Sequence, residues 1–338
     1  MKLFPLFVLI LLLQGILFSN ANFSSDFSLP IDGKSRVISC FGGCQISDDL
    51  EGIDFLINLG LYTDPDSKEP VLAMQKGYIK KILLNDKKLG NAIYIGHDKN
   101  LTSAYTNLSA FSGEFTGLAD AISSEFNTKR SVIRFAKNEF EIEQGEIIGF
   151  SGMSGDFSRP GCYVQIIDEE KNLALNPLDY FEETSLFDLH SHPYEEERVI
   201  DFERIRINFN EFDLNKGVVY PFQGDNPMIQ LKISSRANYG ETKLSLKQLK
   251  VFFDAKETLF IDMDSLPLDK IDEGERIFGE GSNHQNFWYR LTTPWFFGPI
   301  KTNTVKNIER FNDKIRVRIE AIDCFGNSGE IKFWLKRR

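Results

Sequence analysis

The chain has 338 residues, of which 42% are hydrophobic and 26% are charged, an ordinary composition for a globular protein. This composition excludes a disordered chain, a collagen-like chain and a multi-span membrane protein. The 49 acidic residues outnumber the 39 basic residues and give a formal net charge of -10. An acidic chain gains nothing from the counterion release that drives nucleic-acid binding, so we expect no nucleic-acid partner and no adsorption to an anionic membrane.

The first residues have the pattern of a secretory signal peptide. Lys2 supplies a positive charge, Leu3–Leu13 is an uncharged apolar run, and Ser19–Ala21 offers small or polar residues for cleavage. The apolar run is short for a transmembrane helix, and no basic stop-transfer cluster follows it. We therefore predict a signal peptide over 1–21, export to a periplasm or to the cell exterior, and no stable membrane insertion after cleavage. An uncleaved anchor is the alternative.

Export changes the interpretation of the four cysteines, because disulfides persist in exported proteins. Cys40, Cys44, Cys162 and Cys324 allow three pairings, and the sequence alone does not select one. The spacing of Cys40 and Cys44 does not match a zinc knuckle, and no second close pair exists. We expect a bridge within the first half of the chain, with Cys324 left free.

Two regions with different sequence patterns follow the predicted signal peptide. Short β-branched runs bounded by turn residues, such as Tyr78–Leu84 and Tyr163–Ile167, predict antiparallel strands up to about Phe181. The spacing of apolar residues over Leu118–Phe126 predicts a helix. After a charged stretch, alternating runs such as Ile315–Ile322 predict a β-sandwich. We therefore predict an all-β protein with a first domain over 22–185, a linker over 186–199 and a second domain over 200–338.

Eight segments of the first region occur in a recognisable order: 36–42, 51–55, 71–79, 90–97, 101–108, 144–155, 160–166 and 176–180. Their content and order resemble the lysostaphin/LytM-type zinc metalloendopeptidases, which cut peptide cross-bridges in bacterial cell walls. The resemblance covers the first region only and implies an antiparallel LytM-like β domain of the duplicated hybrid motif type. Separately, Asp323–Asn327 loosely resembles a hairpin of bacterial immunoglobulin-like modules, which implies an immunoglobulin-like β-sandwich after the linker.

The resemblance also locates the residues that the family uses for chemistry. Its members bind zinc with the His and Asp of a His-x-x-x-Asp pair and with the second His of a His-x-His pair. Those positions hold Leu50, Asp54 and Gln165 in this chain, and the two catalytic His positions hold Asn107 and Tyr163. Leucine cannot ligate a metal, and a neutral amide is a poor zinc ligand. Four of the five positions are therefore replaced, and we expect a lost zinc site, no cofactor and no catalytic residues.

These observations predict an exported, catalytically inactive homologue of a LytM-type peptidase. Relatives with degenerate sites give a precedent for binding and regulating other wall hydrolases. The predicted partner is thus a peptidoglycan peptide or a cell-wall hydrolase. We expect the binding groove to be lined by the five family positions, Leu50, Asp54, Asn107, Tyr163 and Gln165.

Two alternatives remain open. The first is a metal-dependent cell-wall endopeptidase that recruits other ligands, such as Asp54 with His97, or the pair His190 and His192. A structural role for His97 and a solvated linker for the pair are the favoured interpretations. The second is a structural or adhesive surface module in which the sandwich is the working part. The aromatic residues between Trp288 and Phe297 would then form a sugar- or peptide-binding surface, although strand-interior packing is the favoured interpretation for them.

Overall fold

The structure, a computed structural model, describes residues 27–31, 35–47, 52–113, 115–117, 121, 130–181, 198–237, 242–305 and 311–338. The predicted signal peptide, most of the predicted helix over 118–126 and nearly all of the predicted linker lie outside these residues. Strands dominate the described chain, with short 3-10 helices η1 (Asp98–Asn100), η2 (Pro177–Asp179) and η3 (Leu268–Arg276) between them. The prediction of an all-β protein is confirmed. The described residues contain no helix with the length and apolarity that a membrane span requires.

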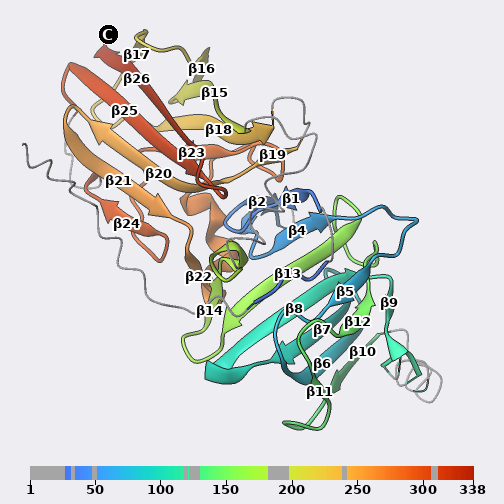
Figure 1. Cartoon of the computed structure of the whole chain (residues 1–338). Helices are drawn as coiled ribbons and strands as arrows, with labels where there is room; N and C mark the ends of the chain where they lie inside the picture. The colour runs from blue at the N-terminus through green and yellow to red at the C-terminus, as the bar shows by residue number, and fades with distance from the viewer. Residues whose placement is uncertain are drawn as a thin grey trace, which may run out of the picture.

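The first half of the chain is built on one large antiparallel sheet (Figure 1). A three-stranded sheet and the two-stranded β2–β3 sheet accompany it. The strands of the large sheet are, in spatial order, β1 (Val37–Ser39), β4 (Leu59–Tyr62), β13 (Gly161–Asp168), β8 (Leu101–Leu108), β7 (Gly90–Gly96), β6 (Gly77–Asp86) and β10 (Ser131–Arg134), with β11 (Glu141–Ile142) on β6 and β14 (Leu173–Leu175) on β13. The smaller sheets contain β5 (Pro70–Leu72), β12 (Ile147–Phe150) and β9 (Ala110–Phe111), and β2 (Cys44–Ile46) and β3 (Ile53–Phe55).

Alternation along β8 and β13 separates the two faces of the large sheet. Tyr105 and Val164 are paired across the strands and belong to the main hydrophobic cluster of this half. Gln165 is paired with Ala104, one residue along each strand, so this pair lies on the opposite face. Ala104 belongs to a small separate cluster. The family positions on β13 are therefore directed away from the main core.

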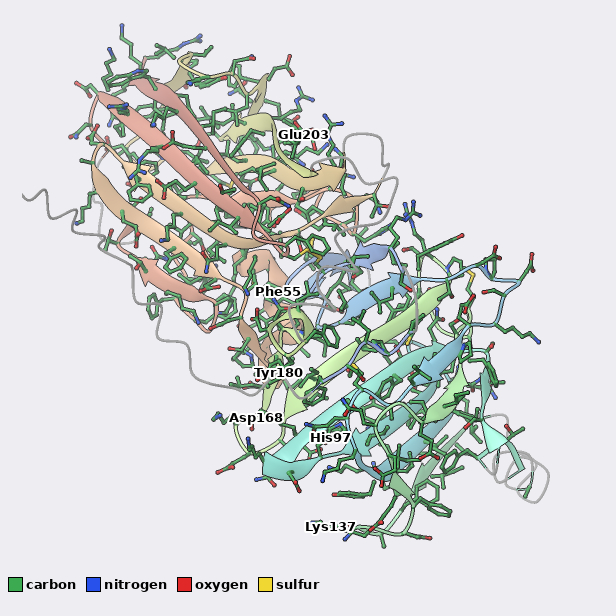
Figure 2. All side chains as sticks on the ribbon, in the orientation of Figure 1. Phe55, His97, Lys137, Asp168, Tyr180 and Glu203 are labelled. Carbon is green, nitrogen blue, oxygen red and sulfur yellow. A yellow bond between two sulfur atoms is a disulfide. The ribbon has the colours of Figure 1, made fainter. Side chains whose placement is uncertain are left out.

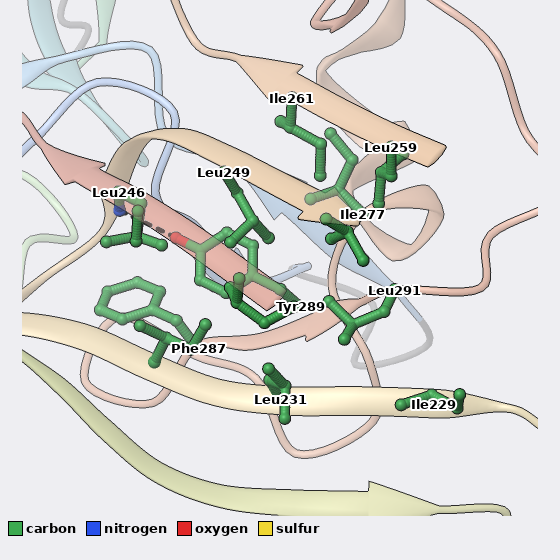
Figure 3. Packing of buried hydrophobic residues seen from close by; sticks show 14 of the residues in the cluster. Ile229, Leu231, Leu246, Leu249, Leu259, Ile261, Ile277, Phe287, Tyr289 and Leu291 are labelled. Carbon is green, nitrogen blue, oxygen red and sulfur yellow. Dashed lines mark hydrogen bonds between the residues drawn. The ribbon is translucent and has the colours of Figure 1, made fainter. Parts of the chain in front are cut away.

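The second half is a sandwich of two sheets with a hydrophobic cluster between them (Figure 3). Tyr289 lies within that cluster, and its hydroxyl accepts a hydrogen bond of 2.8 Å from the backbone N–H of Leu246. This bond satisfies a fully buried polar atom. One sheet contains β16 (Asn210–Asp213), β15 (Arg198–Ile207), β18 (Ile229–Ala237), β19 (Lys243–Leu244) and β23 (Trp288–Arg290), and the other contains β17 (Val219–Phe222), β26 (Ser328–Arg337), β25 (Lys314–Asp323), β20 (Leu246–Phe253), β21 (Lys256–Asp262) and β24 (Ile300–Asn303).

The two halves share strands and core. Strand β14 of the first half pairs with β22 (Ser265–Pro267) of the second, which extends the large sheet across the junction. Phe55 lies at the junction (Figure 2), and its ring is 5.8 Å from that of Phe278. Phe41 and Phe55 belong to the hydrophobic cluster of the sandwich. Most of the predicted linker over 186–199 lies outside the described part, and β15 already begins at Arg198, so the predicted domain bounds stay a prediction.

A disulfide between Cys40 and Cys324 also joins the halves, with their Cα atoms 6.6 Å apart. The expectation of a bridge within the first half, with Cys324 free, is therefore wrong. Cys44 and Cys162 are the free thiols, and both are fully buried on strands. The pairing depends on tertiary packing and not on distance along the chain. Cys40 follows β1 and Cys324 lies in the β25–β26 turn, and only the packing of the sandwich against β1 and β2 brings these segments together.

The disulfide gives a chemical prediction. Unfolding the chain without reductant should expose two reactive thiols, Cys44 and Cys162, and reduction should raise the count to four. Replacing Cys40 and Cys324 together by Ser should lower the free energy of unfolding by about 2–5 kcal/mol, because the bridge closes a very long loop. Thiol titration and urea unfolding measure these two quantities. Four thiols without reductant would contradict the pairing.

Candidate functional site

The structure brings together two of the predicted groove positions. Asn107 is near the end of β8, and Tyr163 on β13 is paired with its neighbour Thr106. Gln165 is two residues further along β13. Asp54 lies in the separate β2–β3 sheet, where it is paired with Gln45. Leu50 lies outside the described residues.

Asn107 has a structural role that sequence reasoning missed. Its side chain is 0% exposed, and its backbone is left-handed, with φ of 68°. The Nδ2 group donates to the carbonyl oxygens of Gly152 at 2.8 Å and Gly161 at 3.1 Å. The Oδ1 atom accepts from the N–H of Gly155 at 3.0 Å. One amide thus holds the connection from β12 to β13 in place. Asparagine suits this position because it tolerates left-handed backbone better than most residues.

The ring and the hydroxyl of Tyr163 also have contacts within the protein. Its ring stacks on Phe157 at a centroid distance of 4.0 Å, and its hydroxyl donates to the carbonyl oxygen of Arg159 at 3.0 Å. A Cβ atom at Gly60 would lie 2.6 Å from the ring, so the ring fills the space that this glycine leaves. Burial raises the pKa of Tyr163 to about 12. The phenol is therefore neutral near pH 7 and cannot serve as a general base.

These side chains do not fit a zinc site. Zinc takes imidazole, thiolate or carboxylate ligands. The amide of Asn107 is bonded to backbone groups, Tyr163 keeps its proton, and Gln165 is a neutral amide that is itself buried. Within the described part of the chain, no three His, Cys, Asp or Glu residues are grouped so as to hold a metal.

A cavity of about 360 Å³ lies at the junction of the two halves, beside Tyr163, and no sequence motif indicates it. Of the predicted groove residues that the structure describes, Tyr163 lines the cavity, whereas Asp54, Asn107 and Gln165 do not. Its walls come from both halves: β1, β2 and the 156–158 loop of the first, and β19 and the 283–287 turn of the second. No local pattern could reveal it, because its lining residues come from separate segments of the chain, 38–58, 156–163, 243–245 and 283–287.

His97 has the environment of a structural histidine (Figure 2). Its Nδ1 atom is 2.8 Å from the carbonyl oxygen of Lys76, and its Nε2 atom is 2.8 Å from Ser103 Oγ. Phe27 packs edge-on against the imidazole at 5.3 Å. Burial lowers the pKa of His97 below 6.5. Both ring nitrogens thus have partners. His190 and His192 lie outside the described residues.

The aromatic residues between Trp288 and Phe297 divide into two sets. Trp288 and Tyr289 are buried on β23 and belong to the interior. Trp295 and Phe296 are exposed by 47% and 56%. The guanidinium of Arg276 is 4.6 Å from the centre of the Trp295 ring, a cation–π contact. Strand-interior packing therefore accounts for part of this cluster only.

No protein-family model matches the chain, and no curated protein matches it. Among solved structures, one that is similar is the complex of SpoIIIAH and SpoIIQ: 17% identity, 46% of this chain and 99% of that chain covered, TM-score 0.33. The catalytic domain of a prophage-encoded M23 protein, EnpA from Enterococcus faecalis, is 17% identical. The match covers 42% of this chain and 88% of that chain, with a TM-score of 0.30. The catalytic domain of lysostaphin from Staphylococcus simulans is 16% identical, with 38% of this chain and 76% of that chain covered and a TM-score of 0.27. The likeness is coarse at these scores and shows neither a shared ligand nor a shared activity.

The hydrogen bonds of Asn107 predict a large effect on stability. Asn107→Ala should lower the free energy of unfolding by about 3–5 kcal/mol, because buried backbone groups of Gly152, Gly155 and Gly161 lose their partner. Urea unfolding measures this. Asn138→Ala is the matched control, since Asn138 is also left-handed, with φ of 61°, but is exposed. It should cost about 1 kcal/mol. Equal losses in the two variants would contradict the role of Asn107.

The environment of His97 predicts a pH dependence of stability. Since the folded pKa lies below the unfolded value of 6.5, the contribution of His97 is complete above about pH 6.5. It is lost as the pH falls from there through the lower folded pKa, because the unfolded chain binds the proton more tightly. Urea unfolding at pH 7.5 and 5.5 should show this loss, and His97→Gln should reduce the difference. An unchanged difference in His97→Gln would show that other groups cause the dependence.

Proposed function

We propose that the chain is an exported, non-catalytic relative of LytM-type peptidases that binds a peptide, either from the cell wall or from a wall hydrolase. The observation that carries this proposal is that the side chains at both family catalytic positions are hydrogen-bonded to the protein's own backbone. Asn107 is bonded to three backbone groups, and Tyr163 donates to a fourth. Neither side chain has a free group with which to move a proton at a scissile bond.

General acid–base catalysis near neutral pH needs a group whose pKa lies close to the operating pH. An amide has no such pKa, and burial raises that of Tyr163 to about 12. Gln165, on the same face of the sheet, is neutral as well. The replacements thus remove the chemistry from one region of the sheet and leave a cavity beside it.

The cavity supports the binding of a ligand, and the disulfide supports export of the chain. A volume of about 360 Å³ lies within the range of pockets that take small ligands. The Cys40–Cys324 disulfide suits an oxidising compartment, in agreement with the leader sequence. The resemblance to wall peptidases supplies the nature of the proposed ligand.

The test uses the full mature chain with its disulfide intact. Elemental analysis without added chelator should find far less than one zinc per chain, and incubation with purified wall peptides and added zinc should give no cleavage. The chain should nevertheless be retained on purified cell wall or by a purified wall hydrolase. Close to one zinc per chain together with peptide cleavage would restore the metalloendopeptidase alternative. Absence of retention on either partner would remove the binding proposal.

A further inference from the structure

Strand β10 is an edge of the large sheet. The order of strands ends at β10, and no second strand among the described residues pairs with it. Its partner is β6, with Ser131 opposite Leu84 and Arg134 opposite Lys81. Figure 1 shows β10 at the margin of the sheet, beside β6. An edge strand presents a row of backbone groups with which another extended chain can pair.

The backbone groups of Val132 and Arg134 are directed away from β6. The N–H of Phe135 donates to the carbonyl oxygen of Lys80, so the odd-numbered residues of β10 bond to β6. Because bonding alternates along an antiparallel strand, the N–H and C=O groups of Val132 and Arg134 point to the free side. Both residues are exposed, Val132 by 56%. The edge therefore offers two donors and two acceptors to a further strand.

Two cationic side chains lie on the outer face of the sheet at this edge. Arg134 is paired with Lys81, and Lys81 is paired with Tyr94, so the three side chains share a face. Lys81 Nζ lies 3.7 Å from the centre of the Tyr94 ring. The adjacent Lys80 forms an ion pair of 2.5 Å with Glu169. In the part of the chain that the structure describes, neither Lys81 nor Arg134 has such an acidic partner.

The charges of Lys81 and Arg134 also act on each other. Burial, and then the charges of Arg134 and Lys80, lower the pKa of Lys81. A carboxylate between Lys81 and Arg134 would offset this repulsion, because opposite charges on neighbouring strands attract. In a chain with a net charge of -10, this cationic edge is suited to an acidic ligand.

The other face of the edge is apolar. Ile133 and Phe135 are partly buried and pack against the main hydrophobic cluster of the first half. The side chains of a strand added to β10 would alternate between this apolar face and the cationic face. The segment that matches the edge therefore has acidic residues at alternate positions and apolar residues between them.

Two alternatives fit less well. At the edges of the sandwich sheets, Glu211 of β16 is already paired with Arg206, and β17 contains Pro221, which has no N–H. A second copy of this chain would pair with β10 around a two-fold axis. That arrangement would bring Lys81 and Arg134 of both copies to one face, where like charges repel.

We propose that the free edge of β10 is a docking site for an extended segment of a partner protein, whose alternating acidic side chains pair with Lys81 and Arg134. The segment adds one strand to the large sheet, and its backbone bonds to Val132 and Arg134. This proposal goes beyond the proposed function, because β10 contains none of the five family positions and does not line the junction cavity.

The test uses the full disulfide-bonded chain and the peptide acetyl-Thr-Val-Glu-Val-Glu-Val-Thr amide, followed by NMR titration and amide hydrogen exchange. Binding should slow exchange at Val132 and Arg134, whose N–H groups gain acceptors, and leave Ile133 unchanged. Peptides with Gln or Lys in place of Glu measure the charge requirement. The Gln peptide should bind about fivefold more weakly, the effect of exposed ion pairs, and the Lys peptide should bind more weakly still.

Methylation of the peptide backbone tests the strand pairing without any change to the protein. The glutamates lie opposite Val132 and Arg134, so their N–H groups face β10, whereas those of the valines face away. N-methylation of both glutamates should abolish binding, and N-methylation of the valines should leave it. The two methylated peptides have the same charge and serve as matched controls for each other.

Variants of the chain test the same edge from the protein side. Arg134→Gln should weaken binding of the acidic peptide about threefold. Arg316→Gln is the matched control, since Arg316 is an exposed arginine on β25, and it should have no effect. Val132→Pro should weaken binding about tenfold, because it removes an outward N–H. The fold should persist, since proline is tolerated where the N–H of an edge strand faces away from the sheet.

The contrary outcomes are distinct. Slow exchange at Val132 and Arg134 in the free chain would show that the edge is already paired and overturn the proposal. Equal affinity for the Lys peptide would overturn the acidic segment, and equal affinity for the peptide methylated at its glutamates would overturn strand pairing. A dimer that Val132→Pro dissociates would assign the edge to a second copy. Loss of retention on cell wall and hydrolase, with binding of the acidic peptide intact, would overturn the proposed function only.

Discussion

The covalent bond between Cys40 and Cys324 holds the turn after β1 against the β25–β26 turn. The second of these turns is itself rigid, because the fully buried Asp323 accepts bonds from the N–H groups of Phe325 and Asn327 and from the Ser235 hydroxyl. The bridge therefore joins two fixed points rather than two loose ends. Phe325 and Leu244 pack against the cluster of the first half, and Phe41 and Phe55 pack into the cluster of the second. The relative position of the halves, and with it the junction cavity, depends on this constraint.

The fold was accessible to sequence reasoning where a strand is defined by its own pattern. Alternation over Ile315–Ile322 predicted β25, and the apolar run Tyr163–Ile167 predicted the centre of β13. Long alternating strands expose their periodicity because one face is buried and the other is not. The pairing of cysteines has no such local signature. A bridge within the first half would join cysteines that are closer in the chain, but the folded structure pairs Cys40 with Cys324.

The candidate site was accessible only in part. The order of the first-half motifs predicted a groove lined by five residues, and of those that the structure describes only Tyr163 lines the junction cavity, so the groove stays a prediction. It gave Asn107 the role of a groove residue, whereas the side chain is buried and bonded to the β12–β13 connection. Its left-handed backbone could not be derived from the sequence, although asparagine is the residue type that permits it. The walls formed by Ser245 and His284 carry no motif, since they become neighbours of β2 only after the sandwich docks.

Buried positions of a sheet such as 107 and 163 carry an energetic requirement of their own. A catalytic side chain that is lost leaves space and unpaired backbone groups, which destabilise the fold until other contacts satisfy them. In this chain, Asn107 donates to the carbonyl oxygens of Gly152 and Gly161 and Tyr163 donates to that of Arg159, so both side chains stabilise the β12–β13 connection. Other buried polar atoms, among them the Oγ atoms of Ser151 and Ser245, have no hydrogen-bond partner among the described residues. Removing the side chain of Asn107 or Tyr163 would leave backbone groups of this connection without a partner, so the two residues are part of what holds the first half together.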